Sequence, residues 1–168
     1  MPSKYYSLFD KSYHSFLNIK SMKKLFVILM SVVALTAFVS CNDKPVTIDK
    51  LPSKAKTFLN TYFPGVTVAY VIKEEDGDYD VDLVDGTEVD FRPNGDWKKV
   101  DCHNRPVPQG FFPASIATYV SNNYVGGYIE EIEFEHNRYK VSLVDASGFE
   151  TDFDLVFDKN GNYIGIDD

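Results

Sequence analysis

Carboxylate side chains alternate with apolar ones in the middle of the chain, at Asp78, Asp80, Asp82, Glu88 and Asp90. Because successive side chains of a β-strand point to opposite faces, this spacing predicts a sheet with one acidic face. We predict that Asp80 lies opposite Asp90 and that Asp82 lies opposite Glu88. Such a face can attract a cationic partner or supply oxygen ligands to a hard divalent cation. The plainer interpretation is a solvated outer face of the sheet.

A calcium loop of the EF-hand type is excluded by the glycine positions. Neither 76–82 nor 158–162 has a glycine at the sixth position, which such a loop requires. Cys102, His103 and His136 also lack the paired spacing of a zinc site. We therefore assign no metal ligand and no cofactor.

Cys102 and His103 suggest nucleophilic catalysis, because a thiolate needs a nearby base. They are neighbours in a polar, proline-containing connector, where adjacent side chains rarely point at each other, and His136 falls in a predicted hairpin turn. The sequence also has no glycine-rich phosphate loop, no Gly-x-Ser-x-Gly elbow and no His-Glu-x-x-His motif. We predict no catalytic residue and no enzymatic activity.

The elements that must position the acidic residues occur twice along the chain. Two stretches have apolar residues at the i, i+3, i+4, i+7 spacing of an amphipathic helix, each after a proline. The first stretch holds Ala55, Phe58, Leu59 and Tyr62, and the second holds Ile116, Tyr119, Val120 and Tyr124. A strand-rich segment follows each, and 79–85 resembles 139–145. This repeat predicts an α+β fold of two tandem units, each one helix packed on a four-stranded antiparallel meander sheet.

Three turns set the predicted strand register of the first unit. Residues 76–77, Asp-Gly, fit a two-residue hairpin turn. Residues 84–86 and 93–95 fit three-residue loops that end with glycine in the left-handed conformation. The first turn then brings Tyr70 and Ile72 onto the apolar face, and a slip of one residue would reverse that assignment.

The N-terminal part has the layout of an export signal, with Lys23-Lys24 followed by the apolar run 25–39. The run is shorter than the roughly 20 residues that a membrane-spanning helix needs. Phe38-Val39-Ser40-Cys41 resembles the lipobox of bacterial lipoproteins, in which the cysteine is acylated and becomes the first residue of the mature chain. We predict lipidation at Cys41 and a biological start at Met22.

The residues after Cys41 are strongly acidic, with 24 Asp and Glu against 12 Lys and Arg. This balance argues against nucleic acid as a partner and against docking of the domain on anionic lipid. Membrane contact is therefore expected only through a lipid anchor at Cys41. Cys102 is the one other cysteine, so lipidation of Cys41 leaves no internal disulfide.

Several short motifs resemble those of the PepSY-like family, also described as β-lactamase-inhibitor-like. They are Leu51-Pro52, Tyr-Phe-Pro-Gly at 62–65, Tyr-x-Val-x-Leu-x-Asp-Gly at 79–86 and Phe-x-x-x-Gly-x-Trp at 91–97. The second unit departs from the pattern at 125–127, where Val-Gly-Gly replaces Pro-Gly. The resemblance implies an exported or tethered binding module, inhibitor-like in type, with two tandem repeats and no assigned enzymatic activity. We carry over no functional residue, because the matching positions define the fold.

These observations divide the chain into a leader with a lipoprotein signal peptide (1–40), a first repeat with its connector (41–105) and a second repeat (106–168). The predicted function is a non-catalytic, lipid-anchored binding module of the cell envelope, periplasmic or at the outer-membrane surface. It would recognise a protein or peptide partner through Asp80, Asp82, Glu88 and Asp90. The alternative is a protein that binds a divalent cation or a small ligand.

Overall fold

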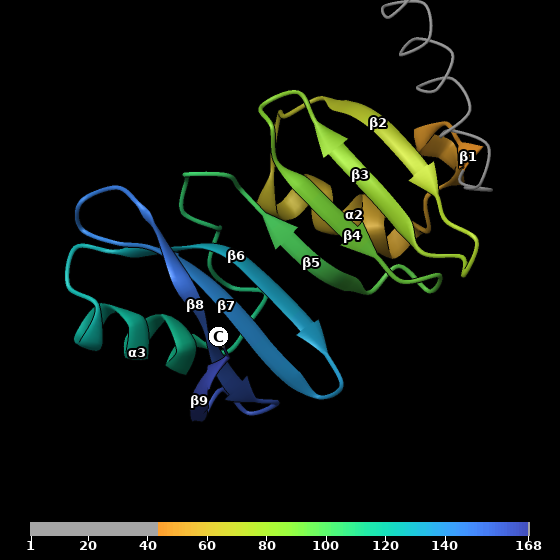
Figure 1. Cartoon of the computed structure of the whole chain (residues 1–168). Helices are drawn as coiled ribbons and strands as arrows, with labels where there is room; N and C mark the ends of the chain where they lie inside the picture. Colours follow the sequence, from red (N-terminus) through yellow and green to blue (C-terminus); the bar gives the residue numbers. More distant parts are fainter. Residues whose placement is uncertain (1–43, 168) are drawn as a thin grey trace, which may run out of the picture. The chain divides into compact units, whose positions relative to one another are not determined.

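The computed structural model describes residues 44–167, whose strands form a single antiparallel sheet (Figure 1). The strands are β1 (Lys44–Pro45), β2 (Val68–Lys73), β3 (Tyr79–Leu83), β4 (Glu88–Phe91), β5 (Trp97–Asp101), β6 (Tyr128–Glu135), β7 (Arg138–Val144), β8 (Glu150–Asp158) and β9 (Tyr163–Asp167). They lie side by side in chain order. The helices are a 3₁₀ turn, η1 (Ile48–Lys50), and two α-helices, α2 (Ser53–Tyr62) and α3 (Ala114–Asn123). No helix in this part of the chain is long and apolar enough to cross a membrane.

The prediction of two tandem units, each with its own four-stranded sheet, is wrong. Strand β5 pairs with β6, with Val100 opposite Ile132, so the sheet continues without a break through nine strands. Both side chains are completely buried. A separate first sheet would have left the backbone N–H and C=O groups of β5 unpaired along one edge. The chain between β5 and β6 instead returns so that β6 covers this edge.

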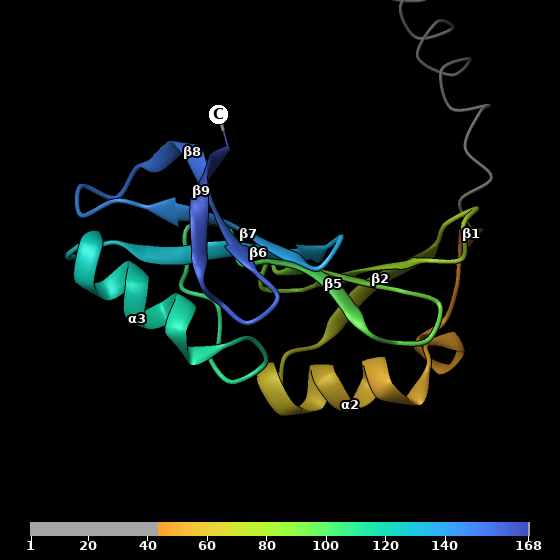
Figure 2. The ribbon, with the colours of Figure 1, turned by 90° about the horizontal axis from the view of Figure 1, so that it is seen from below.

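Helices α2 and α3 cover the same face of the sheet (Figure 2). Each begins directly after a proline, Pro52 or Pro113, whose fixed φ suits the start of a helix. The buried helix residues are Ala55, Phe58, Leu59, Ile116 and Val120. The two predicted amphipathic helices are therefore confirmed.

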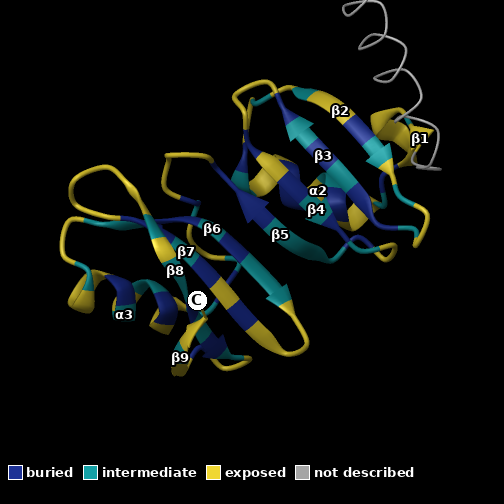
Figure 3. Cartoon of the chain, viewed as in Figure 1, coloured by how far each residue is buried: buried dark blue, intermediate teal, exposed yellow. Residues whose placement is uncertain are grey.

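The core lies between the two helices and the sheet (Figure 3). Along the sheet, one row of buried side chains crosses the strands from β2 to β8, formed by Val71, Val81, Val89, Val100, Ile132, Val141 and Leu155. Aromatic rings join the helices to this layer. Phe58 of α2 meets Phe91 edge-on at 5.6 Å between ring centroids, and Tyr119 of α3 meets Phe157 at 5.4 Å. Burial of these apolar surfaces drives the helices onto the sheet.

The predicted register of β3 and β4 is confirmed. Asp80 lies opposite Asp90 and Asp82 lies opposite Glu88. The turn between the two strands is the expected three-residue loop, because the N–H of Gly86, at a φ of 87°, donates to the carbonyl of the last β3 residue. Glycine adopts such a positive φ without steric cost.

The predicted two-residue turn between β2 and β3 is wrong. The N–H of Glu74 donates to the carbonyl of Asp78 at 3.0 Å, and the N–H of Gly77 donates to the carbonyl of Glu74 at 3.1 Å. The loop therefore has three residues, 75–77, and not two. This adds one residue to the connection and shifts the register of β2 by one position.

The shift moves the side chains of β2 to the opposite faces from those predicted. Val71 lies opposite Val81 and is buried in the core. Tyr70, expected in the core, lies opposite Asp82 and is 67% exposed. Ile72 likewise lies opposite Asp80, on the face away from the helices.

Candidate functional site

The face of the sheet away from the helices, which we call the outer face, carries two rows of side chains that cross the strands. The first row is Ile72, Asp80, Asp90, Lys99, Glu133, Lys140, Val156 and Gly165. The second row is Tyr70, Asp82, Glu88, Asp101, Glu131, Ser142, Asp154 and Asp167. The structure therefore brings the predicted residues Asp80, Asp82, Glu88 and Asp90 together as two neighbouring pairs.

The outer face is acidic well beyond the four predicted residues. Pairing of β5 with β6 continues both rows into the second half of the chain and adds Glu131, Glu133 and Asp154. Lysines lie among them and form ion pairs, Lys99 with Glu131 at 2.8 Å and Lys140 with Asp154 at 2.9 Å. Negative charge is thus only partly compensated along the rows.

Asp90 is a carboxylate of the outer face whose pKa is strongly raised. It is half-buried between Asp80 and Lys99, and loss of solvation raises its pKa to about 6. The charges of Lys99 and Lys98 lower this pKa, whereas the charge of Glu88 raises it. Within residues 44–167 Asp90 forms no ion pair, and its neighbours Lys98 and Lys99 pair with Asp78 and Glu131.

At the edge of these rows, His103 joins two carboxylates. Its Nε2 lies 3.1 Å from Oε1 of Glu88, and its Nδ1 lies 3.2 Å from Oδ1 of Asp101. The backbone N–H of His103, which has a φ of 40°, also donates to Asp101 Oδ1 at 2.8 Å. The hydrogen bond with Glu88 raises the pKa of His103, partial burial opposes it, and the charge of Asp101 adds to it.

Glu88, Asp101 and His103 could also hold a metal ion, because one ligand atom from each lies within 4.8 Å of the others. Two carboxylates and an imidazole suit zinc better than calcium, which takes oxygen ligands. Asp101 was missed by the sequence analysis, which considered His103 as a base for Cys102 and as a zinc ligand together with Cys102 and His136. The sequence signal for this cluster was the Asp-Cys-His triplet at 101–103, which begins at the last residue of β5.

Cys102 and His103 do not form a catalytic pair. Both ring nitrogens of His103 contact carboxylates, and the thiol of Cys102 is buried on the other side of the strand. Burial raises the pKa of the Cys102 thiol to about 11, so it stays protonated at neutral pH. A protonated, buried thiol is a poor nucleophile.

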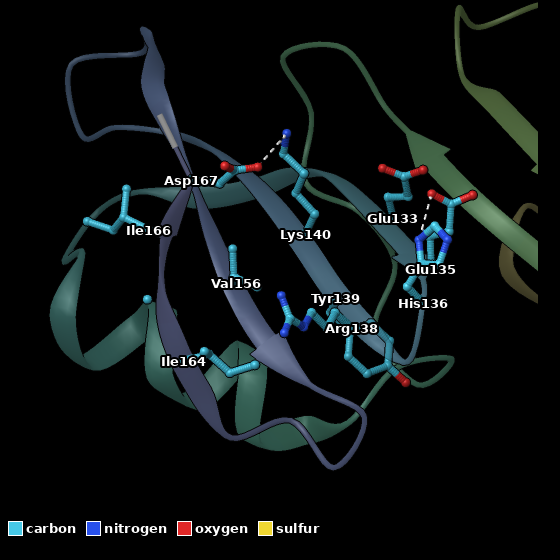
Figure 4. Close-up of a pocket in the computed structure, with 11 residues that line it drawn as sticks. Glu133, Glu135, His136, Arg138, Tyr139, Lys140, Val156, Ile164, Ile166 and Asp167 are labelled. Carbon is cyan, nitrogen blue, oxygen red and sulfur yellow. Dashed lines mark ion pairs between the residues drawn. The ribbon is translucent and has the colours of Figure 1, made fainter.

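A hollow of about 740 Å³ opens on the outer face over β7, β8 and β9 (Figure 4). Val156, Ile164 and Gly165 give it an apolar lining. Charged side chains surround this lining, among them Arg138 and Lys140. Lys140 forms an ion pair with Asp167 at 3.3 Å. The mixture suits a partner that offers both apolar and charged groups.

Residue Cys41 and the leader lie outside the described residues, so lipidation stays a prediction from the sequence. Of the residues predicted to be functional, the structure describes the candidate binding residues but not Cys41.

Comparison with known proteins gives a family model and several solved structures. The family model described as "Putative beta-lactamase-inhibitor-like, PepSY-like" matches residues 77–165. Among curated proteins, none matches this chain.

Two solved structures from Bacteroides are similar over nearly their whole length. A "putative calcium-regulated periplasmic protein" of Bacteroides thetaiotaomicron is 32% identical, with 76% of this chain and 98% of that chain covered and a TM-score of 0.67. A "putative periplasmic protein from DUF2874 family" of Bacteroides vulgatus is 34% identical, with 76% and 98% covered and a TM-score of 0.66. These descriptions name no catalytic activity, and they support a location in the periplasm or cell envelope. The chain belongs to the PepSY-like family.

Proposed function

We propose that this protein is a non-enzymatic, lipid-anchored binding protein of the cell envelope whose outer face recognises a basic protein or peptide. The lipobox-like sequence at Cys41 and the periplasmic relatives support the location. The family description supports an inhibitor-like binding module rather than an enzyme. The buried, protonated thiol of Cys102 and the carboxylate contacts of His103 argue against nucleophilic catalysis.

The observation that carries the proposal is the half-buried carboxylate of Asp90 on the acidic outer face. Two carboxylates directly opposite each other on neighbouring strands are destabilising, and partial burial of Asp90 adds a desolvation cost. A lysine or arginine of a partner that reaches Asp90 would offset this desolvation cost. Residues that cost stability in the free protein are characteristic of surfaces kept for binding.

The test compares Asp80→Asn/Asp82→Asn/Asp90→Asn with wild type in residues 42–168, which form one compact unit. Each form is immobilised, envelope extract is passed over it, and bound proteins are quantified by mass spectrometry. The control triple variant Asp49→Asn/Glu75→Gln/Glu150→Gln removes the same charge outside the two rows. Circular dichroism verifies that all three forms are folded.

We expect basic proteins to be lost from the outer-face variant and retained by the control. Because the attraction is electrostatic, capture by wild type should also fall as salt shortens the screening length to below about 8 Å. Equal capture by all three forms, unaffected by salt, would exclude the acidic face as the binding surface.

Binding of a divalent cation is the second candidate, favoured by the cluster of Glu88, Asp101 and His103. One relative is described as calcium-regulated, which supports a cation-dependent function here as well. A cation that binds only the folded state raises the melting temperature by mass action. Melting is therefore measured with calcium, with zinc and with a chelator, for wild type and for His103→Asn.

The two cations distinguish the ligand sets. A zinc shift that His103→Asn abolishes would place the ion at the imidazole, whereas a calcium shift that survives this change would place it among carboxylates. Melting temperatures that neither cation changes would eliminate this candidate. Since Glu88 belongs to both proposed sites, a bound cation would compete with a basic partner.

A further inference from the structure

The hollow over β7, β8 and β9 contains a cation without a counter-charge. Arg138, which lines it, lies between Glu135 of β6 and Asp158 of β8, its direct neighbours across the sheet (Figure 4). Glu135 pairs with His136 at 3.3 Å, and both carboxylate oxygens of Asp158 accept hydrogen bonds from its own turn. In the part of the chain that the structure describes, Arg138 forms no ion pair. Its guanidinium is therefore available to an anionic group of a ligand.

Exposed apolar side chains lie beside Arg138. Val156 of β8 faces Lys140, two residues beyond Arg138 on β7, so Arg138 and Val156 are diagonal neighbours about 7–8 Å apart. Ile164 and Ile166 of β9 also line the hollow and are 52% and 50% exposed. This arrangement fits a ligand whose carboxylate and apolar group lie close together.

The opposite rim of the hollow is acidic. Glu133 of β6 lines this rim and forms no ion pair within residues 44–167. The first row of the outer face runs from Val156 through Lys140 and Glu133 to Asp90 on β4. Neighbouring strands are about 4.8 Å apart, so the four steps from β8 to β4 span about 19 Å, the length of about six extended residues. A peptide of that length can reach from the hollow to Asp90.

We propose that the hollow binds the free C-terminus of a peptide that ends in a large apolar residue. The terminal carboxylate contacts Arg138, and the last side chain packs on Val156 and Ile164. A lysine or arginine about six residues upstream reaches Asp90. This inference rests on the proposed function and deepens it, because it names the kind of partner that the same outer face recognises.

Other anions match this lining less well. Lys140 is already held by Asp154 at 2.9 Å and by Asp167 at 3.3 Å, so the hollow offers one uncompensated cation and not a basic surface. A polyanion needs several cations. A fatty acid supplies one carboxylate, but six of the eleven lining residues have acidic or basic side chains, which hydrocarbon cannot solvate. A peptide provides polar groups for these side chains as well as an apolar one.

The test measures the binding of fluorescent peptides to residues 42–168 by anisotropy. The first peptide is Lys-Gly-Ser-Gly-Ser-Gly-Leu, with the fluorophore on its N-terminus and a free C-terminal carboxylate. The second has the same sequence and ends in a carboxamide. We expect the carboxamide to bind at least about tenfold more weakly, because it cannot form a charge-assisted hydrogen bond with the guanidinium.

Variants of the hollow assign this preference to its residues. Arg138→Gln should bind both peptides equally, and as weakly as wild type binds the carboxamide. The matched control Lys159→Gln removes the same charge from the turn between β8 and β9, outside the lining, and should keep the tenfold preference. Ile164→Ser should weaken binding of the peptide that ends in leucine and leave a peptide that ends in glycine unaffected. Circular dichroism verifies that each variant is folded.

Asp90→Asn separates this inference from the proposed function. It should weaken binding of the lysine peptide, but not of a peptide with serine in place of lysine, and the preference for a free carboxylate should persist. An effect of Asp90→Asn without one of Arg138→Gln would refute the contact with the C-terminus alone. An effect of Arg138→Gln without one of Asp90→Asn would refute the contact between a basic residue and Asp90 alone.

Three further results would overturn the inference. The first is a wild type that binds neither peptide below about 1 mM, and the second is a wild type that binds both peptides equally. The third is displacement of the peptide by decanoate at a lower concentration than by unlabelled peptide. That result would assign the hollow to alkyl carboxylates in general.

Discussion

Asp80 and Asp90 lie directly opposite each other on β3 and β4, and the second of them is half-buried. On the opposite face of the same two strands, Val81 and Val89 are completely buried. The hydrophobic effect therefore fixes which face of these strands points to the core. The position of the two carboxylates is therefore a consequence of core packing, whereas their chemical identity is not. Asparagine at either position would fit the strand without the repulsion.

Replacing Asp90 by Asn should stabilise the protein at neutral pH. The pKa of Asp90 is raised to about 6 in the folded state, so its ionisation disfavours folding. In wild type the favourable contribution of the protonated Asp90 carboxyl to stability is fully present below about pH 4. This contribution is lost as the pH rises through 6. We expect Asp90→Asn to gain about 1–2 kcal/mol at pH 7, after allowance for solvent screening, and nothing at pH 4. Urea unfolding at both pH values measures this, and a gain that is equal at the two values would contradict the assignment.

Ile132→Ala should weaken the whole sheet and not only its second half. Ile132 is completely buried and lies opposite Val100 at the junction of β5 and β6. We expect a loss of about 2–5 kcal/mol in one cooperative transition. Ile164→Ala, at a half-exposed site, should cost far less. Two separate unfolding transitions, with only one affected, would be inconsistent with a single cooperative sheet.

Two glycines with the same backbone conformation should respond differently to alanine. Gly65 and Gly161 both have a φ of 80°, so each substitution carries the same strain of about 1–2 kcal/mol. At Gly65 the new Cβ meets open space, but at Gly161 it lies 2.7 Å from Cβ of Pro113 and also contacts Ser115. We expect Gly161→Ala to cost about 1–3 kcal/mol more, because Pro113 starts α3 and has little room to move. Equal losses in thermal unfolding would show that α3 can shift.

Cys102 should be unreactive in the folded protein. Burial raises its thiol pKa from 9.0 to about 11, which reduces the thiolate fraction about 100-fold. In residues 42–168 it is the only thiol, so its alkylation by iodoacetamide at pH 8 can be followed directly. The rate in the native state should be at least about 100-fold below that in urea. A native rate close to the unfolded one would restore Cys102 as a candidate nucleophile.

The sequence predicted those features that depend on neighbouring residues. Apolar spacing located both helices, and glycine at positions 86 and 95 located two three-residue loops. The alternation of acidic and apolar residues then placed Asp80 and Asp82 on one face. The error at β2 arose because Asp-Gly at 76–77 fits two kinds of turn, and the loop found in the protein begins one residue earlier.

The continuity of the sheet could not be predicted in the same way. Val100 and Ile132 are separated by a connector and a helix, and neither residue carries a signal that names the other as its partner. The extension of the acidic rows to Glu131 and Asp154 depends on this pairing, so these residues were missed with it. The hollow beside β9 does not depend on this pairing, since its lining residues come from β6, β7, β8 and β9 and the turn after β6.

The pairing of β5 with β6 has a consequence for biogenesis. A chain that crosses a membrane from its N-terminus delivers β2 to β5 before β6, and until β6 arrives the last of these strands has an unpaired side. Such an open edge pairs readily with other unfinished chains. The interval between the emergence of Asp101 and that of Glu135 is therefore when the nascent chain is most open to such pairing.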